Sequence, residues 1–114
     1  MRIIACDFDG SIHKGSYPYI GQPNQDLIDY LIESRRNGDK VILWTCRTDV
    51  FLVEAVNWCK GMGLEFDAVN RNLPESIARY GHDGRKIFAD IYIDDRAAYP
   101  SDFKLSRRGR HRHR

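Results

Sequence analysis

The chain begins with a short apolar run that ends in two carboxylates. Residues Ile3-Ile4-Ala5-Cys6 lead directly into Asp7-Phe8-Asp9-Gly10-Ser11. Four consecutive apolar residues predict a strand buried on both faces, which is typical of a parallel sheet covered by helices. Because successive side chains alternate along a strand, Asp7 and Asp9 are expected to point the same way, about 7 Å apart. Unpaired buried charge is costly, so this pair predicts a cation beside it.

Strand and helix patterns alternate along the rest of the chain. Apolar residues at helical spacing predict helices, and short apolar runs predict further strands. The expected elements are a loop or small hairpin over 12–21, a helix over 24–37, a strand over 41–44, a helix over 49–62, a strand over 64–69, a helical segment over 74–80 and a strand over 91–93. This alternation implies parallel pairing with right-handed crossovers, so we expect a three-layer α/β sandwich with a mostly parallel sheet.

Polar residues follow three of the predicted strands. Asp7 and Asp9 follow the first strand, Thr45 the second, and Asp94-Asp95 the last. Ligands of such sheets bind at the carboxyl ends of the strands, so these residues are expected to form one site. Four carboxylates there would repel one another, and a hard divalent cation, best Mg²⁺, would relieve the repulsion. A carboxylate such as Asp7 can also attack phosphorus, while Asp9 transfers protons.

The charge of the chain is unevenly distributed. Residues 104–114 hold six of the 18 basic residues and none of the 16 acidic ones, so residues 1–103 carry 12 basic against 16 acidic groups, or −4. We expect residues 1–103 to form one core domain and residues 104–114 to be a basic, disordered tail, because the tail has little apolar surface to bury. Such a tail either binds nucleic acid or another polyanion, or is a dispensable solvated terminus.

Composition narrows the cellular setting. No apolar run approaches the roughly 20 residues of a membrane span, and the first 12 residues lack the pattern of a secretory signal. We therefore expect a cytoplasmic protein with no membrane partner. The three cysteines, Cys6, Cys46 and Cys59, lack the spacing of a zinc site and are interpreted as free thiols.

The motifs described above resemble those of the haloacid dehalogenase (HAD) superfamily of phosphohydrolases over residues 1 to about 99. The first HAD motif is similar to Asp7-Phe8-Asp9-Gly10-Ser11, where Ser11 stands in place of the usual Thr. Thr45 matches the hydroxyl residue that ends the second strand. Lys86 is assigned to the basic residue ahead of the last core strand, and Asp94-Asp95 match the acidic pair after it. Four ordered motifs are far more specific than any one of them.

The resemblance implies a Rossmann-like sheet of strand order 4-1-2-3 and a role for the motif residues. Asp7 would be nucleophile and metal ligand. Asp9 would be the acid and base, and would also offer its backbone carbonyl to Mg²⁺. Asp94, with Asp95 in support, would complete the metal site, and Thr45 would hold the transferring phosphoryl group.

The same resemblance leaves the basic residue and the substrate contacts open. Lys86 would steady the nucleophile and the phosphoryl charge, although Arg47 and Arg85 could also supply positive charge. Gly10, Ser11, Cys46 and Arg47 are the expected substrate-binding residues. For Arg47, the alternative is a surface ion pair with an acid such as Asp49.

The spacing of the motifs predicts no cap domain, the insertion that many HAD enzymes use to enclose small metabolites. The 34 positions from Ser11 to Thr45 and the 41 from Thr45 to Lys86 are filled by the predicted elements. Uncapped members act on large phosphorylated substrates, or oligomerise so that a neighbour closes the site. We therefore expect a Mg²⁺-dependent phosphatase that forms an aspartyl-phosphate and acts on a nucleotide, a polynucleotide end or another accessible phosphomonoester. The alternative is a nucleic-acid-binding or phosphate-binding module that uses the basic tail without catalysis.

Overall fold

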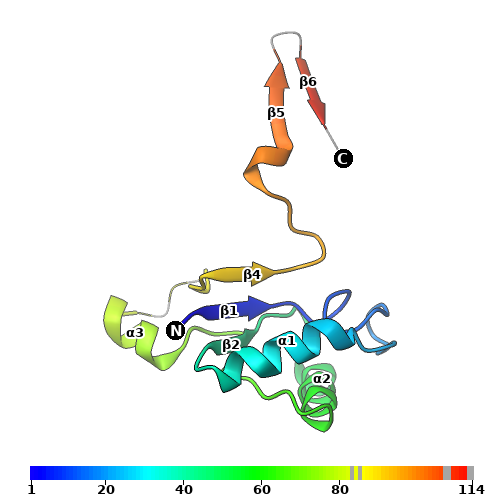
Figure 1. Cartoon of the computed structure of the whole chain (residues 1–114), viewed down its shortest axis with the longest axis vertical. Coiled ribbons are helices and arrows are strands. Elements are labelled where there is room, and N and C mark those ends of the chain that lie inside the picture. Colours follow the sequence, from blue (N-terminus) through cyan, green and yellow to red (C-terminus); the bar gives the residue numbers. More distant parts are fainter. Residues whose placement is uncertain (83, 85, 107–108, 113–114) are drawn as a thin grey trace.

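The computed structural model describes residues 1–82, 84, 86–106 and 109–112. At its centre is a sheet of four parallel strands in the order β3-β2-β1-β4 (Figure 1). The strands are β1 (Ile3–Cys6), β2 (Lys40–Leu43), β3 (Ala68–Val69) and β4 (Ile91–Ile93). This order confirms the predicted 4-1-2-3, counted from the opposite edge, and places β1 between β2 and β4.

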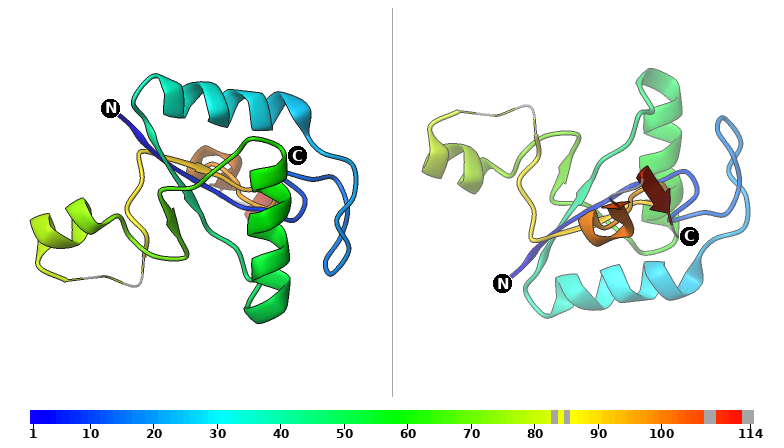
Figure 2. Two further views of the ribbon diagram at one scale, coloured as in Figure 1. Left: turned by 90° about the horizontal axis from the view of Figure 1, so that it is seen from below. Right: turned by 90° about the horizontal axis from the view of Figure 1, so that it is seen from above.

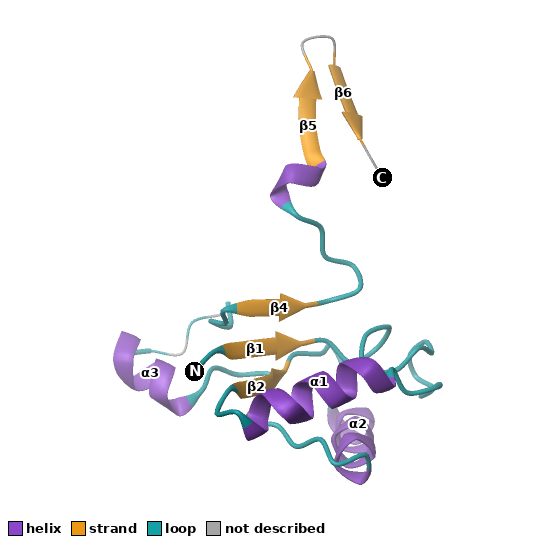
Figure 3. Ribbon diagram, in the orientation of Figure 1, coloured by secondary structure: helices purple, strands orange, loops and turns teal. Residues whose placement is uncertain are grey.

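Two helices cover one face of the sheet. α1 (Gln25–Arg36) and α2 (Asp49–Gly61) lie on the same side of it (Figure 3). The side chain of Asn24 accepts a hydrogen bond from the N–H of Leu27 at 3.4 Å and so caps the start of α1. Alternate strand residues and the apolar faces of both helices form the larger core: Ile4, Cys6, Ile28, Leu31, Val41, Leu43, Ala55 and Cys59.

The opposite face of the sheet has a smaller core. It is formed by Ile3, Ala5, Ile42, Ala68, Leu73 and Ile87. α3 (Pro74–Tyr80) begins next to Leu73 and lies near the amino ends of the strands (Figures 1 and 2). The α/β fold and its parallel sheet are therefore confirmed, and α3 has the predicted bounds.

The third strand is shorter than the sequence predicts. A strand is expected over 64–69, but only Ala68–Val69 pairs with β2. The carboxylate of Asp67 accepts the N–H of Val41 at 2.8 Å and two hydrogen bonds from Arg35, at 3.1 and 3.2 Å. Just before β3, the side chain of Asp67 thus replaces a backbone carbonyl as the acceptor for Val41. The apolar pattern of residues 64–69 does not reveal this replacement.

The chain beyond β4 leaves the sheet. A short 3₁₀ turn, Pro100–Asp102, precedes an antiparallel pair, β5 (Phe103–Ser106) and β6 (Gly109–Arg112), which stands away from the sheet (Figure 1). The segment that the sequence predicts to be a disordered tail thus includes most of this strand pair. Residues 107, 108, 113 and 114 of the predicted tail lie outside the described residues. Within the described residues, no helix has the length and apolar character that crossing a membrane requires.

Candidate active site

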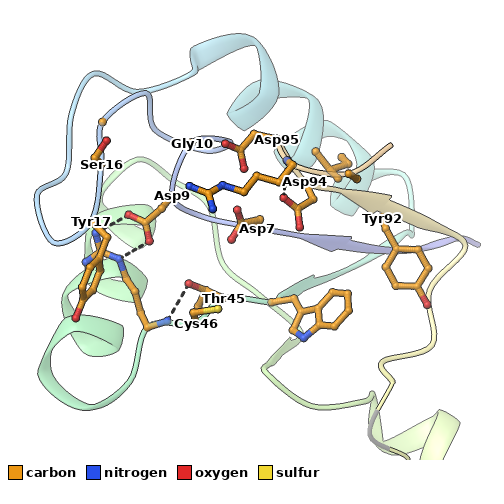
Figure 4. Close-up of a pocket in the computed structure, with 16 residues that line it drawn as sticks. Asp7, Asp9, Gly10, Ser16, Tyr17, Thr45, Cys46, Tyr92, Asp94 and Asp95 are labelled. Carbon is orange, nitrogen blue, oxygen red and sulfur yellow. Dashed lines mark hydrogen bonds and ion pairs between the residues drawn. The ribbon is translucent and has the colours of Figure 1, made fainter. Parts of the chain in front are cut away.

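A pocket of about 890 Å³ lies at the carboxyl ends of β1, β2 and β4 (Figure 4). Its walls come from four segments of the chain: Asp7, Asp9 and Gly10, residues 15–17, residues 44–47, and residues 92–97. The expectation that the residues after the predicted strands meet at one edge of the sheet is therefore confirmed.

Three carboxylates meet in this pocket. Asp7 follows β1, and Asp94 and Asp95 follow β4. Cys6 is in register with Ile93, and the N–H of Asp7 donates to the carbonyl of Ile93 at 2.9 Å, so the two chains leave the sheet side by side. Carboxylate oxygens of the three residues lie within 4.8 Å of one another. Three of the four predicted metal ligands are thus brought together (Figure 4).

The surroundings of Asp7 favour its neutral form. Burial, together with the negative charges of Asp94, Asp95 and Asp9, raises the pKa of Asp7 to about 6. A hydrogen bond from the backbone of Phe8 acts in the opposite direction. A group of oxygen donors with this excess of negative charge is the kind of site that a hard divalent cation occupies in proteins.

Gly10 allows Asp95 to approach the cluster. Its φ of +83° lies in the left-handed region that side chains rarely adopt. A Cβ atom at this position would also collide with the carboxylate of Asp95. The glycine of the first motif therefore allows both the turn of the backbone and the close packing of Asp95, a candidate metal ligand.

The side chain of Asp9 lies outside the carboxylate cluster. Arg47 donates to both of its oxygens, from Nε at 2.9 Å and from Nη2 at 2.8 Å, and Nε2 of His13 lies 2.8 Å from Oδ1. Burial by itself would raise the pKa of Asp9, but the hydrogen bonds from Arg47 and His13 outweigh it and hold that pKa below the usual value. The prediction of Asp9 as a metal ligand therefore does not extend to its carboxylate, which points toward Tyr17 (Figure 4).

His13, which the sequence analysis did not single out, is a buried part of this site. Its Nδ1 accepts hydrogen bonds from the N–H groups of Gly15 and Gly21, each at 3.0 Å. This pattern assigns the ring proton to Nε2, which donates to Asp9. The imidazole therefore joins the loop over 12–21 to Asp9, a contact between residues four apart that no sequence pattern indicates.

Arg47 has a role beyond the two that the sequence predicts. Its side chain is 1% exposed, so a surface ion pair is excluded. Besides Asp9, its donors reach the carbonyl oxygens of Pro18 at 3.3 Å and Phe51 at 3.4 Å, and its guanidinium lies 4.9 Å from the ring centroid of Phe8. Arg47 also lines the pocket, so its contact with a substrate phosphate stays a prediction. Arg47 positions Asp9.

The predicted hydroxyl and thiol residues differ in their access to the pocket. Thr45 and Cys46 both line it. Thr45 is held on both sides, since its Oγ1 accepts the N–H of Arg47 at 3.2 Å and its own N–H donates to Asn70 at 2.8 Å. Ser11 is buried and does not line the pocket, and its Oγ has no hydrogen-bond partner within the described part of the chain. The prediction of Ser11 as a substrate contact is wrong.

Besides Arg47, a positively charged residue that the sequence analysis missed lines the pocket. Lys86 is exposed and does not line the pocket, and its Nζ lies 5.6 Å from the ring centroid of Tyr92. Arg85, the alternative, lies outside the described residues. Arg96 does line the pocket, and its N–H donates to Asp94 at 2.9 Å. The sequence signal that could have identified Arg96 is its position directly after the acidic pair Asp94-Asp95.

Comparison with known proteins gives one informative match. No protein-family model matches the chain, and no curated protein matches it. The fold is similar to a solved structure of a conserved protein from Bacteroides thetaiotaomicron, with 38% sequence identity and a TM-score of 0.75. The match covers 84% of this chain and 77% of that one. Identity at this level over most of both chains shows that the protein belongs to the same family as this conserved Bacteroides protein.

Proposed function

We propose that the protein is a Mg²⁺-dependent phosphatase of the HAD type that hydrolyses phosphomonoesters through an aspartyl-phosphate on Asp7. The observation that carries the proposal is the group of carboxylates formed by Asp7, Asp94 and Asp95, which come from two neighbouring strands. The hydroxyl residue Thr45 lines the same pocket. These residues have the order and the strand positions of the HAD motifs that the sequence resembles.

The donor set fits Mg²⁺. It consists of hard carboxylate oxygens, and the site is open to the pocket, which leaves room for water and a substrate phosphate. Asp7, Asp94 and Asp95 would hold the ion. When bound, Mg²⁺ offsets the negative charge shared by these carboxylates and the phosphoryl group.

The proposed reaction has two steps. An oxygen of Asp7 forms a bond to phosphorus while the bond from phosphorus to the substrate oxygen breaks. Water then attacks phosphorus, inorganic phosphate leaves and the carboxylate of Asp7 is restored. Thr45 and Arg96, which both line the pocket, contact the phosphoryl oxygens during transfer.

Asp9 accepts the proton of the attacking water in the second step. The ion pair with Arg47 keeps Asp9 ionised, which is the form that a general base requires. The same ion pair makes Asp9 a reluctant acid in the first step. Leaving groups that need no proton, such as phenolates, are therefore expected to depart fastest.

The test is hydrolysis of an aryl phosphate with and without Mg²⁺. Wild-type protein should release the phenol only with Mg²⁺, and Asp7→Asn should abolish release while circular dichroism shows an intact fold. Asp26→Asn, which removes an exposed carboxylate of α1 that does not line the pocket, is the matched control and should retain activity. Activity in EDTA, or an active Asp7→Asn variant, would refute the mechanism.

A second candidate function rests on the basic tail. The hairpin that contains most of residues 104–114 stands away from the sheet, where a polyanion can reach it (Figure 1). We propose nucleic-acid binding by this segment as the alternative to catalysis. Affinity for an oligonucleotide should fall with salt, and removal of residues 106–114 should flatten that dependence. An unchanged salt slope after truncation would dismiss the alternative.

A further inference from the structure

Two aromatic residues border the pocket next to the carboxylates. Trp44 follows β2, Tyr92 lies in β4, and both line the pocket. Their ring centroids are 5.7 Å apart, with the ring planes tilted by 54°. The residues are nevertheless 41% and 37% exposed. Aromatic side chains of this size gain much from burial, so a partly exposed pair beside a candidate active site indicates a surface that a ligand covers.

The alternation of side chains along the strands explains why these rings and the carboxylates share one face. Ala5 is in register with Ile42 on one side and with Tyr92 on the other. Residues two positions apart point to the same face, so Asp7 continues the row of Ala5, and Trp44 continues the row of Ile42. Because Ala5 on the central strand β1 has only a methyl side chain, the rings of Trp44 and Tyr92 have room to meet above it.

The orientation of Tyr92 is fixed by its hydroxyl. The hydroxyl donates to the carbonyl of Ile87 and accepts the N–H of Ala89 at 3.2 Å. The polar end of the side chain is thus already in use, and what Tyr92 offers to the pocket is the ring. A ring held in place before the ligand arrives loses little conformational entropy on binding.

The other aromatic residue of the pocket, Tyr17, is less available. Its ring packs against Phe51, with centroids 5.4 Å apart, and lies 5.2 Å from the guanidinium of Arg47. Figure 4 shows Tyr17 and Tyr92 on opposite sides of Asp7. The side of Trp44 and Tyr92 is therefore the better candidate for a planar group.

We propose that Trp44 and Tyr92 stack on the base of a nucleoside monophosphate whose phosphate lies at Asp7. This inference rests on the proposed phosphatase function. Tyr92 and Asp94 are two positions apart, roughly 7 Å along the strand, which is a span that a sugar between phosphate and base can bridge. The pocket volume of about 890 Å³ lies within the range of about 300–1,000 Å³ that small-molecule sites occupy.

The test compares two substrates that differ only in the base. Adenosine 5′-monophosphate and ribose 5-phosphate share the phosphate and the sugar. The ratio of their kcat/KM values should favour the nucleotide in wild-type protein and fall about tenfold in Trp44→Leu, as expected for the loss of one stacking contact. Trp44→Phe, which keeps a ring, should retain most of the ratio. Tyr19→Leu removes an exposed tyrosine that does not line this pocket and should leave the ratio unchanged.

A binding measurement separates this inference from the proposed function. The chain has two tryptophans, so in a Trp58→Phe background Trp44 alone reports by fluorescence. With Mg²⁺ present, adenosine 5′-monophosphate should quench Trp44 and ribose 5-phosphate should not. Quenching without hydrolysis of any phosphomonoester would overturn the phosphatase and keep the aromatic surface. Hydrolysis of both substrates with equal kcat/KM, unaffected by Trp44→Leu, would overturn the aromatic surface and keep the phosphatase.

Discussion

Replacing the proposed nucleophile should stabilise the protein when no metal is bound. Asp7 lies among Asp94, Asp95 and Asp9, and burial together with these charges raises its pKa from 3.8 to about 6. At neutral pH the folded protein must therefore hold an ionised group in surroundings that oppose ionisation. Asp7→Asn removes that charge and keeps an oxygen that can accept the backbone hydrogen bond from Phe8.

The size of the effect follows from the shift in pKa. Each unit corresponds to about 1.4 kcal/mol, so a shift from 3.8 to about 6 gives an upper limit of about 3 kcal/mol. Asp7 is only partly buried, and water screens the repulsion, which reduces the expected gain to about 1–2 kcal/mol. For a chain of 114 residues, this is a rise in Tm of about 4–8 °C.

The gain has a defined dependence on pH. A carboxyl whose pKa is higher in the folded than in the unfolded state destabilises the fold once the unfolded chain ionises, from pH 3.8 upward. The penalty grows until the folded state also ionises near pH 6 and is constant above that. The advantage of Asp7→Asn should therefore be complete at about pH 7.5 and much smaller at about pH 4.5.

Thermal or urea unfolding in EDTA at several pH values measures this gain directly. Asp26→Asn, which changes the same group on an exposed helix position, should show no comparable trend. Addition of Mg²⁺ should then stabilise wild type more than Asp7→Asn, because the variant has lost a ligand. A gain of equal size at both ends of the pH range, or an Asp7→Asn protein less stable than wild type at neutral pH in EDTA, would refute the reasoning.

Three further predictions concern the neighbours of Asp7. Gly10→Ala combines a strained backbone with a collision against Asp95, so Mg²⁺ affinity measured by calorimetry should fall at least tenfold while circular dichroism stays native. Arg47→Met leaves His13 as the remaining one of the two side chains that bind Asp9. The free energy of unfolding, measured in urea at neutral pH, should fall by about 3 kcal/mol. Since the pKa of Asp9 is lowered in the folded state, that cost should shrink below about pH 4, and a constant cost would contradict the ion pair. Thr45→Val should lower kcat for an aryl phosphate about 10²-fold with little change in Tm, and an unchanged kcat would remove Thr45 from the site.

The sheet and the carboxylates of the site could be predicted because their signals are local. A strand buried on both faces appears as an unbroken apolar run, and β1 and β2 contain such runs. β4 lies at the edge of the sheet and is only partly buried, but its residues Ile91–Ile93 are apolar as well. In a parallel sheet, the residues that follow neighbouring strands all lie at the same end of the sheet, next to one another. The position of Asp7 beside Asp94 therefore follows from two strand ends and a pairing order.

The errors concern side chains whose partners are distant in the sequence. Arg47 and Asp9 are 38 positions apart, and nothing in either segment shows that their ion pair is buried. Ser11 carries the hydroxyl that the motif requires, yet the turn after Gly10 directs it into the protein. Lys86 was assigned by order alone, and order along the chain does not fix which way a loop residue points.

Asp7 and Asp9 show how two identical groups, two positions apart, acquire different chemistry. Asp9 is bound by a buried guanidinium and an imidazole, so it is ionised and fixed in place. Asp7 is flanked by other acids, and within the described part of the chain it is a backbone hydrogen bond from Phe8 that favours its charged form. A nucleophile needs an oxygen that no strong donor occupies, whereas a general base needs to be charged and correctly placed. In the proposed mechanism, the position of Arg47 thus decides which carboxylate attacks, and leaves Asp7 dependent on a cation for its charge.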